Sequence, residues 1–249
     1  MEQFGATAEY YVASKSHQAG DDLPRMIELA EPRPTDRLLD IATGGGNVAR
    51  VFSPHVAEVV ASDLTPRMLA VVEASFAKLG LTNVRIAEAD AEQLPFEDAS
   101  FEIVTCRIAP HHFPYPDRFV AEAARVLKPG GRFLLVDSTV PPGEVGEFWN
   151  RFEHLRDSSH VRTLTTDEWT ELILASGLEL RAVEDYPKRH DFADWVGRAD
   201  VPGSGIDGLL AQIRGASEAV REHARTEWDG DRLVAFTDVK TLFYSLKAE

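Results

Sequence analysis

The sequence predicts one α/β domain in which a mostly parallel sheet of seven strands is covered by helices on both faces. The main observation is that short apolar runs alternate along the chain with stretches whose apolar residues recur at helical spacing. Strands separated by helices pair in parallel and need helical cover on both faces. A second observation is the length, because 249 residues suffice for one sizeable core with an appended cap.

Each expected strand is a short run of apolar and β-branched residues that ends at polar residues or glycine. The first run, RLLDIAT, is typical, because glycines follow it directly. The seven strands are expected at residues 37–43, 58–64, 83–90, 101–107, 132–138, 178–186 and 240–247.

The expected helices are indicated by the residues that begin and end them. The clearest helix has Thr65 as its N-cap, Pro66 in its first turn and Gly80 at its end. The others are expected over residues 46–55, from Asp117 to a stop at Pro129 and Gly130, from Thr166 or Asp167 to Gly177, and over residues 209–228.

Two segments, residues 139–165 and 187–230, break the alternation of strands and helices. Segments that leave such a sheet at its carboxyl edge often cover the binding crevice, so we expect substrate-side insertions. The alternative is that they pack on the outside. Aromatic residues in and near them would either wall a pocket for an apolar or aromatic molecule or form ordinary core. These residues are Phe148, Trp149, Phe152, Trp169, Phe192 and Trp195.

The formal net charge of −15 makes nucleic acid an unfavourable partner and weakly favours a cationic cofactor. The one cysteine, Cys106, cannot form a disulfide within the chain, which fits a reducing cytosol. The first residues lack the pattern of a secretory signal, and no apolar run approaches the roughly 20 residues that span a bilayer. We therefore expect a cytoplasmic protein with no membrane partner.

The strongest motif is LLDIATGGGNVA, residues 38–49, in which glycines separate a strand from a helix. Glycines at this place let the backbone approach a ligand closely and let helix N–H groups face it. The spacing Gly44-x-Gly46-x-x-Ala49 also matches the dinucleotide fingerprint, and a tight turn without a ligand is a further alternative.

Three acidic residues favour a cofactor that carries an amino acid over a dinucleotide. Asp40 precedes the glycines, where it would face a pyrophosphate unfavourably but can serve an ammonium group, directly or through water. Asp63 ends the next strand and is placed to accept hydrogen bonds from both ribose hydroxyls. Asp90, followed by Ala91, ends the third strand and either reads an adenine amino group or serves as a turn residue or helix cap.

With these motifs the sequence resembles the class I S-adenosylmethionine-dependent methyltransferases, and within them the small-molecule group of the ubiquinone/menaquinone-biosynthesis type. The matching segments are LLDIATGGGNVA, VVASDLTPRML, ADAEQLPF and LKPGGRFLLVD. The family's acidic-x-Gly-x-Gly-x-Gly pattern has Ala42 in place of its first glycine, from which we expect a slightly altered turn. The resemblance implies a Rossmann-like three-layer sandwich with an antiparallel last strand and lid insertions.

The resemblance also implies S-adenosyl-L-methionine as the cofactor, bound by a core over residues 37–138. Residues 1–36 would form a helical lid, in which Tyr11 and His17 either contact the methionine end of the cofactor or pack on the core. The other residues implied in cofactor binding are Asp40, Ala42, Thr43, Gly44, Gly46, Asn47, Asp63, Leu64, Met68, Asp90, Ala91 and Arg107.

The loop after the fourth expected strand, CRIAPHHF at residues 106–113, lies beside the transferable methyl group in this fold. His111 and His112 are the candidate catalytic residues, because a neutral histidine suits proton removal near pH 7. At most one is expected to reach the nucleophile, and either could instead cap or pack under the lid. No metal site is expected, because adjacent histidines chelate one ion poorly and the aspartate of metal-dependent relatives is missing.

We therefore predict an enzyme: a metal-free methyltransferase that acts on a small apolar or aromatic acceptor, as a monomer or homodimer. Methyl transfer from a sulfonium is an in-line displacement, in which the protein mainly aligns the reacting groups. Two alternatives remain open. One is a NAD-dependent oxidoreductase, and the other is a cyclase-like protein that binds the cofactor without transferring its methyl group.

Overall fold

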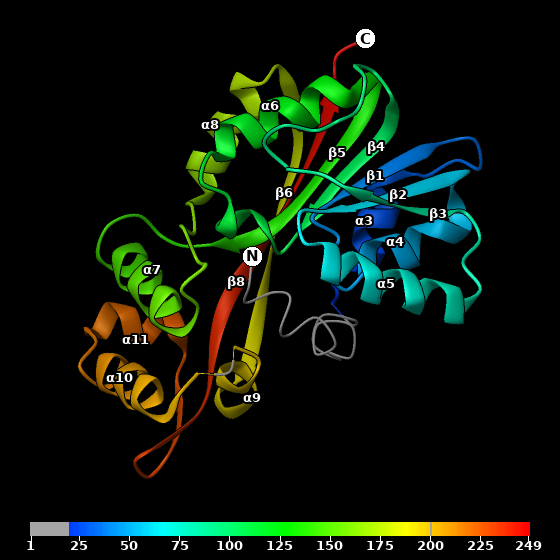
Figure 1. Ribbon diagram of the computed structural model, residues 1–249. Helices are drawn as coiled ribbons and strands as arrows, with labels where there is room; N and C mark the ends of the chain where they lie inside the picture. Colours follow the sequence, from blue (N-terminus) through cyan, green and yellow to red (C-terminus); the bar gives the residue numbers. More distant parts are fainter. Residues whose placement is uncertain (1–19, 200) are drawn as a thin grey trace.

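The computed structural model describes residues 20–199 and 201–249 and shows a twisted sheet with helices on both faces (Figure 1). Seven strands follow the order β3-β2-β1-β4-β5-β8-β6, and the short β7 pairs with β8. The strands are β1 Arg37–Ile41, β2 Glu58–Asp63, β3 Val84–Glu88, β4 Phe101–Arg107, β5 Leu127–Thr139, β6 Leu178–Asp191, β7 Glu227–Asp229 and β8 Arg232–Lys247. The helices are α3 Asp22–Ala30, α4 Asn47–Phe52, α5 Pro66–Leu79, α6 Pro116–Val126, α7 Glu144–Arg156, α8 Thr166–Ala175, α9 Phe192–Gly197, α10 Gly203–Arg214 and α11 Glu218–Ala224, with short 3₁₀ turns η1 Ser53–His55 and η2 Pro110–His112.

The sheet is parallel from β3 to β5, and β8 runs antiparallel between β5 and β6. The predicted fold class is confirmed, including the antiparallel last strand. That strand is longer than predicted, because β8 begins at Arg232, and β7 adds an eighth strand beside it. The added part of β8, residues 232–239, contains Asp238, which forms a 2.8 Å ion pair with Lys240 within the sheet.

Each face of the sheet carries its own apolar cluster. On one face α3, α4 and α5 pack on Leu38, with Phe52 as a large buried member. On the other face α6 and α8 pack on Leu39, through Phe119 and Trp169. Successive strand residues point to opposite faces, so neighbours such as Leu38 and Leu39 join different clusters. Burial on both faces explains why the central strands read as nearly continuous apolar runs.

Two helices test the predicted boundaries. In α5, Thr65 is at the N-cap and Pro66 is in the first turn, as predicted. In α6 the helix ends at Val126, before the predicted stop at Pro129. A residue that precedes proline is disfavoured in the helical conformation, so Lys128 cannot continue the helix and lies in β5 instead.

The cap of α8 differs from the prediction by one position. Thr165, rather than Thr166 or Asp167, is the N-cap. Its hydroxyl accepts a hydrogen bond from the Glu168 N–H (3.1 Å), and the Glu168 carboxylate accepts one from the Thr165 N–H (2.8 Å). This reciprocal capping box needs a glutamate three residues after the cap, which only Thr165 has.

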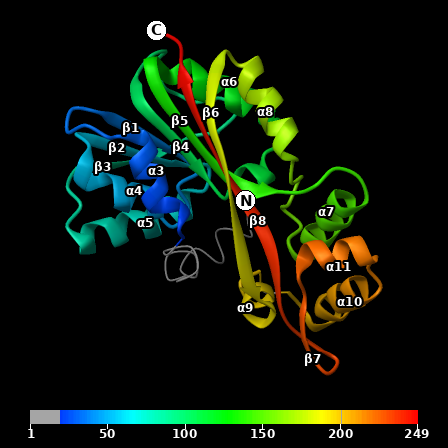
Figure 2. The ribbon, with the colours of Figure 1, turned by 180° about the vertical axis from the view of Figure 1, so that it is seen from behind.

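The two insertions form a second group of helices at the far ends of β6 and β8. Figures 1 and 2 show α7, α9, α10 and α11 grouped there, away from α5. Their apolar cluster contains five of the six aromatic residues singled out above, while Trp169 lies in α8 against the sheet. The single helix expected over residues 209–228 is two helices, because the Ser217 hydroxyl accepts from the Val220 N–H and begins α11. No helix in residues 20–199 or 201–249 is long and apolar enough to cross a membrane.

Candidate active site

A pocket of about 490 Å³ lies where β1, β2 and β4 end. Ligands of open parallel sheets bind outside the carboxyl ends of the strands, which is this position. Of the predicted site residues in the described chain, all but Gly46 line the pocket; Tyr11 and His17 lie outside the described residues. The lining members are Asp40, Ala42, Thr43, Gly44, Asn47, Asp63, Leu64, Met68, Asp90, Ala91, Arg107, His111 and His112.

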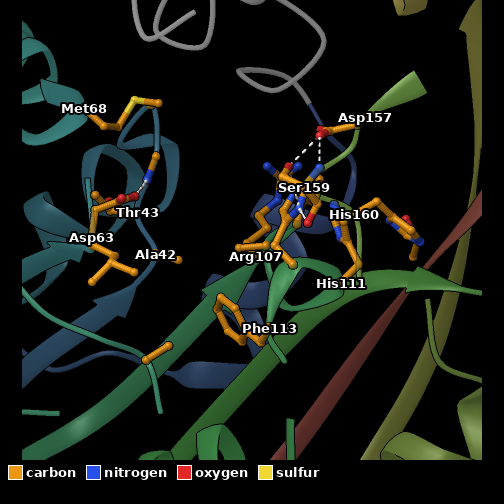
Figure 3. A pocket seen from close by; sticks show the side chains of 18 of the residues that line it. Ala42, Thr43, Asp63, Met68, Arg107, His111, Phe113, Asp157, Ser159 and His160 are labelled. Carbon is orange, nitrogen blue, oxygen red and sulfur yellow. Dashed lines mark hydrogen bonds between the residues drawn. The ribbon is translucent and has the colours of Figure 1, made fainter. Parts of the chain in front are cut away.

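The pocket has two halves. Figure 3 shows Thr43, Asp63 and Met68 on one side and His111 and His160 on the other. We call the first side the cofactor half; it is lined from residues 40–48, 63–68 and 89–92. We call the second the acceptor half; it is lined from residues 107–114, 138, 153–163, 188–198 and 238–240. Both predicted insertion segments therefore contribute residues to the acceptor half.

The turn between β1 and α4 contains three residues in the left-handed region, of which the first two line the pocket. Ala42 has a φ of 52° and Gly44 a φ of 51°. This conformation is easy for glycine but costs an L-residue roughly 1–2 kcal/mol, because its Cβ crowds the following carbonyl oxygen. Ala42 thus holds a conformation that favours glycine. The alanine that replaces the first glycine of the family pattern is therefore under backbone strain.

Gly46 serves packing in this structure and does not line the pocket. It is the residue before α4 and has a φ of 73°. A Cβ at this position would lie 2.4 Å from the Phe76 ring and 2.5 Å from Val72. Glycine is therefore required for the start of α4 to approach α5 closely.

Asp40 is buried at the end of β1, between two threonines. The Thr43 hydroxyl donates to Asp40 Oδ2 (2.6 Å), and the Thr105 hydroxyl donates to Oδ1 (3.0 Å). Burial raises the pKa of Asp40 to about 6, although both hydrogen bonds favour the ionised form. A cationic ligand group beside Asp40 would stabilise the carboxylate, so this site can bind positive charge.

Asp63 closes the glycine loop from the end of β2. Its Oδ2 accepts a hydrogen bond from the Gly44 N–H (3.1 Å), and its Oδ1 accepts one from the Thr65 N–H (2.9 Å). A carboxylate has about four acceptor sites, so Asp63 retains capacity for two hydroxyls. Asp90 Oδ1 accepts from the Glu92 N–H (2.9 Å), so the turn role considered for Asp90 is present at the pocket edge.

Arg107 ends β4 and lies on the acceptor half. Its guanidinium forms an ion pair with Asp22 of α3, in which Nη2 is 3.0 Å from Oδ1. The two side chains are only 5% and 8% exposed. Two N–H groups bonded to one carboxylate fix the orientation of the guanidinium, so α3 anchors this part of the pocket wall.

His111 pairs with a carboxylate that the sequence motifs did not single out. Its Nδ1 lies 2.6 Å from Oδ1 of Asp137, a residue of β5 whose side chain is 1% exposed. A carboxylate accepts a hydrogen bond from Nδ1–H, so the neutral ring has its proton on Nδ1 and Nε2 is the basic nitrogen. Among the residues that the structure describes, Asp137 Oδ2 has no hydrogen-bond partner, so His111 is the polar contact of this buried carboxylate.

His112 takes a different direction from its neighbour. Its Nδ1 is 3.1 Å from the carbonyl oxygen of Ser159, which ties η2 to the loop after α7. Burial, followed by the charge of His111, lowers the pKa of His112 to about 3. The same two causes lower the pKa of His160, also on the acceptor half, to about 3. Both rings are therefore neutral at pH 7 and stay neutral well into acid.

Sequence reasoning missed the polar residues that β5, β6 and β8 contribute to this region: Asp137, Lys188, His190, Asp238 and Lys240. Their one signal is a charged residue inside an otherwise apolar or alternating strand. Structural ion pairs give the same signal, so it cannot identify a site by itself. No group of three or more His, Cys, Asp or Glu side chains within the described ranges is arranged to hold a metal ion.

Known proteins resemble the chain over both of these halves. Residues 39–135 match the family described as a methyltransferase domain. The chain is also 39% identical over 220 residues to the uncharacterized methyltransferase YcgJ of Bacillus subtilis strain 168, a match that covers 88% of this chain and 87% of YcgJ. The chain belongs to the methyltransferase family.

Solved structures agree with this assignment. The crystal structure of YcgJ superposes on this methyltransferase with a TM-score of 0.88 at 36% identity, over 91% of this chain and 98% of YcgJ. The ubiquinone/menaquinone biosynthesis C-methyltransferase UbiE of Stutzerimonas stutzeri is 39% identical over 123 residues, 48% of each chain. The predicted class, a S-adenosylmethionine-dependent methyltransferase, is confirmed, and the nicotinamide-dependent oxidoreductase is set aside.

Proposed function

We propose that this methyltransferase transfers a methyl group from S-adenosylmethionine to an oxygen atom of a small acceptor, with His111 as the general base. The observation that carries the proposal is the 2.6 Å contact between His111 Nδ1 and the buried Asp137 Oδ1. A hydroxyl or phenol must lose a proton as it attacks, and a positioned base accelerates such steps by roughly 10²–10⁴-fold. A free amine needs no base for its attack, so the pair favours an oxygen nucleophile.

The side chains of the cofactor half fit a cofactor with positive sulfonium and ammonium groups. Carboxylates line this half, and none of its described lining residues is a lysine or arginine; the acidic members are Asp40, Asp63, Asp90 and Glu92. In this proposal Asp40 holds the ammonium group, Asp63 accepts from the ribose hydroxyls, and Leu64 and Met68 contact the adenine. When bound, the cofactor supplies a methyl group already activated by the sulfonium, so the chain needs mainly to align the acceptor with it.

The His111–Asp137 pair accounts for proton removal without a metal ion. Asp137 fixes the tautomer in which Nε2 is unprotonated, and it stabilises the imidazolium that forms when Nε2 takes the acceptor's proton. His112 positions the loop through Ser159, and its low pKa keeps a second positive charge away from His111. One histidine thus acts as the base, and its neighbour acts as a positioning residue.

The residues that line the pocket restrict the range of apolar or aromatic acceptors that the sequence predicts. Of the six aromatic residues singled out there, Trp195 alone lines the pocket, and Phe113 is a second aromatic contact. The remaining five belong to the apolar clusters. We therefore propose an acceptor with a ring or a short apolar body that contacts Phe113 or Trp195 and whose other groups are polar.

The test is the formation of S-adenosylhomocysteine with a panel of phenols and small hydroxy compounds. His111→Ala should lower kcat by about 100-fold, because it removes the base, while the affinity for S-adenosylmethionine stays the same. The matched control is His55→Ala, since His55 is exposed at the end of η1 and does not line the pocket.

Two results would change the proposal in different ways. If the protein binds S-adenosylmethionine but forms no S-adenosylhomocysteine with any acceptor, the cyclase-like alternative is favoured. If His111→Ala keeps full activity at every pH tested, methyl transfer stands but the base does not.

A further inference from the structure

Positive charge is concentrated in the acceptor half of the pocket, although the whole chain carries a formal charge of −15. Five cationic side chains and three carboxylates line this half, so cationic side chains are in excess; the carboxylates are Glu153, Asp157 and Asp238. Arg156 pairs with Glu153 (3.1 Å), and the other four cationic side chains come from β4, from β6, from the residue after α9 and from β8. We call these residues the basic wall: Arg107, Lys188, Arg198 and Lys240. The described lining of the cofactor half, by contrast, has four carboxylates and no lysine or arginine, so the balance of charge changes from one half of the pocket to the other.

The register of the strands sets the basic wall on one face of the sheet. Lys188 of β6 stands opposite Asp238 of β8, and Lys240 of β8 stands opposite Ser138 of β5. Residues two apart on a strand share a face, so Lys240 and Asp238 lie on the same side as Lys188. The sheet, rather than a flexible loop, therefore fixes the two ammonium groups.

Hydrogen bonds hold part of the wall in place. Lys240 Nζ lies 2.8 Å from Asp238 Oδ2 and also donates to the Ser138 hydroxyl. Burial alone would raise the pKa of Asp238, but Lys240 and His190 together hold it well below its ordinary value. Asp238 is therefore a fixed anion at pH 7 that orients the Lys240 side chain.

The charged groups around Lys188 produce a positive electrostatic potential at its ammonium group. The pKa of Lys188 is lowered to about 8, first by burial and then by the charge of Lys240, with smaller effects of Arg107 and Arg198. Asp238 opposes these effects without cancelling them. An anion bound beside Lys188 would reverse this balance, since an opposite charge nearby favours the ammonium form.

We propose that the basic wall binds an anionic group of the methyl acceptor, a carboxylate or a phosphate, through Lys188, Arg198 and Lys240. This inference rests on the proposed function, because it takes the acceptor half as the place where the acceptor binds. The anionic group would anchor one end of the acceptor and leave its hydroxyl end toward His111. An acidic protein surface repels such molecules, so a local basic wall is what makes their binding favourable.

The experiment uses three probes on the full-length protein saturated with S-adenosylhomocysteine: inorganic phosphate, benzoate and the neutral isostere benzamide. Calorimetric titrations at constant ionic strength should show saturable binding of at least one anion and about tenfold weaker binding of benzamide than of benzoate if the group is a carboxylate. Phosphate binding without a benzoate preference identifies a phosphate group instead.

The variants locate the site. Lys188→Gln should weaken anion binding by about tenfold, and Arg198→Gln serves as a second variant in case Lys188→Gln is unstable. Lys78→Gln is the matched control, because Lys78 is an exposed residue of α5 far from the lining. All three should bind S-adenosylhomocysteine as the parent protein does.

Each outcome decides one claim. The anionic subsite is overturned if neither phosphate nor benzoate shows saturable binding. It is also overturned if Lys188→Gln and Arg198→Gln both bind the anion as tightly as the parent protein. Failure of the parent protein to bind S-adenosylhomocysteine overturns the proposed function instead, and the two failures are measured in separate titrations.

Discussion

The cofactor half of the pocket is acidic and comes from consecutive loops between residues 40 and 92, whereas the acceptor half is basic and comes from segments spread over residues 107–240. The first half uses backbone turns, buried threonines and carboxylates at strand ends. The second uses cross-strand pairs and two insertions. The difference separates two tasks: one half binds a cofactor common to a family, and the other selects an acceptor.

The largest expected effect comes from breaking the His111–Asp137 pair. Asp137→Asn should lower kcat by about 100-fold, as much as His111→Ala, because the amide can no longer stabilise the imidazolium or fix the tautomer. Affinity for S-adenosylmethionine should stay the same, since Asp137 does not line the cofactor half. Steady-state kinetics and calorimetry measure the two quantities.

The control for this variant is Asp207→Asn, at an exposed position of α10. A parallel loss of cofactor affinity in Asp137→Asn would mean that the two halves are coupled. A normal kcat would remove Asp137 from the mechanism.

A change in the cofactor half should have the opposite signature. Asp63→Ala removes the acceptor of the Gly44 and Thr65 N–H groups and of the proposed ribose hydroxyls. Affinity for S-adenosylmethionine should fall by at least about tenfold, as expected for lost hydrogen bonds to a charged acceptor. Benzoate and phosphate binding should not change. An unaltered cofactor affinity would refute the ribose role.

The pH dependence of cofactor binding sharpens the comparison further. The folded-state pKa of Asp40, about 6, lies above its ordinary value of 3.8. The carboxyl is therefore protonated below pH 6, where it cannot pair with an ammonium group, so the affinity for S-adenosylmethionine should fall by about tenfold from pH 7 to pH 5. Calorimetry at a series of pH values measures this loss.

Asp40→Asn provides the test of this cause. The variant should bind weakly at all pH values and lose the pH dependence below pH 7. The same raised pKa means that the native state without cofactor binds the proton more tightly than the unfolded chain, so Asp40 costs stability as the pH rises from about 4 to about 6. If Asp40→Asn retains the pH dependence of binding, another group is responsible.

The two halves also differ in how far the sequence could predict them. The cofactor half follows from local signals: Asp40 and Asp63 end strands, and the glycines stand between a strand and a helix. In the acceptor half, Lys188 and Lys240 are far apart in the chain and meet only through β6–β8 pairing. Asp137 is the last residue of the segment LKPGGRFLLVD. The sequence does not show which residue this acid pairs with, and only the fold brings His111 next to it.

The smallest expected effect concerns the backbone of the cofactor half. Ala42→Gly should relieve the strain at φ 52°, which costs an L-residue roughly 1–2 kcal/mol. Glycine also makes the unfolded chain more flexible, which costs about 0.5–1 kcal/mol, so the net gain in unfolding free energy should be about 0.5–1 kcal/mol. Urea unfolding measures it.

The reverse change, glycine to alanine, can be made in the same loop at Gly46 and compared with Ala42→Gly. Gly46→Ala adds a Cβ that would lie 2.4 Å from the Phe76 ring, and its φ of 73° is also unfavourable for alanine. It should lose about 2 kcal/mol or more, because α4 must move away from α5. If Ala42→Gly destabilises the protein instead, the Ala42 methyl contributes more to the packing around β1 than its backbone strain costs. The loop would then be adapted to alanine, and the departure from the family's glycine pattern would be a compensated change and no longer a strained one.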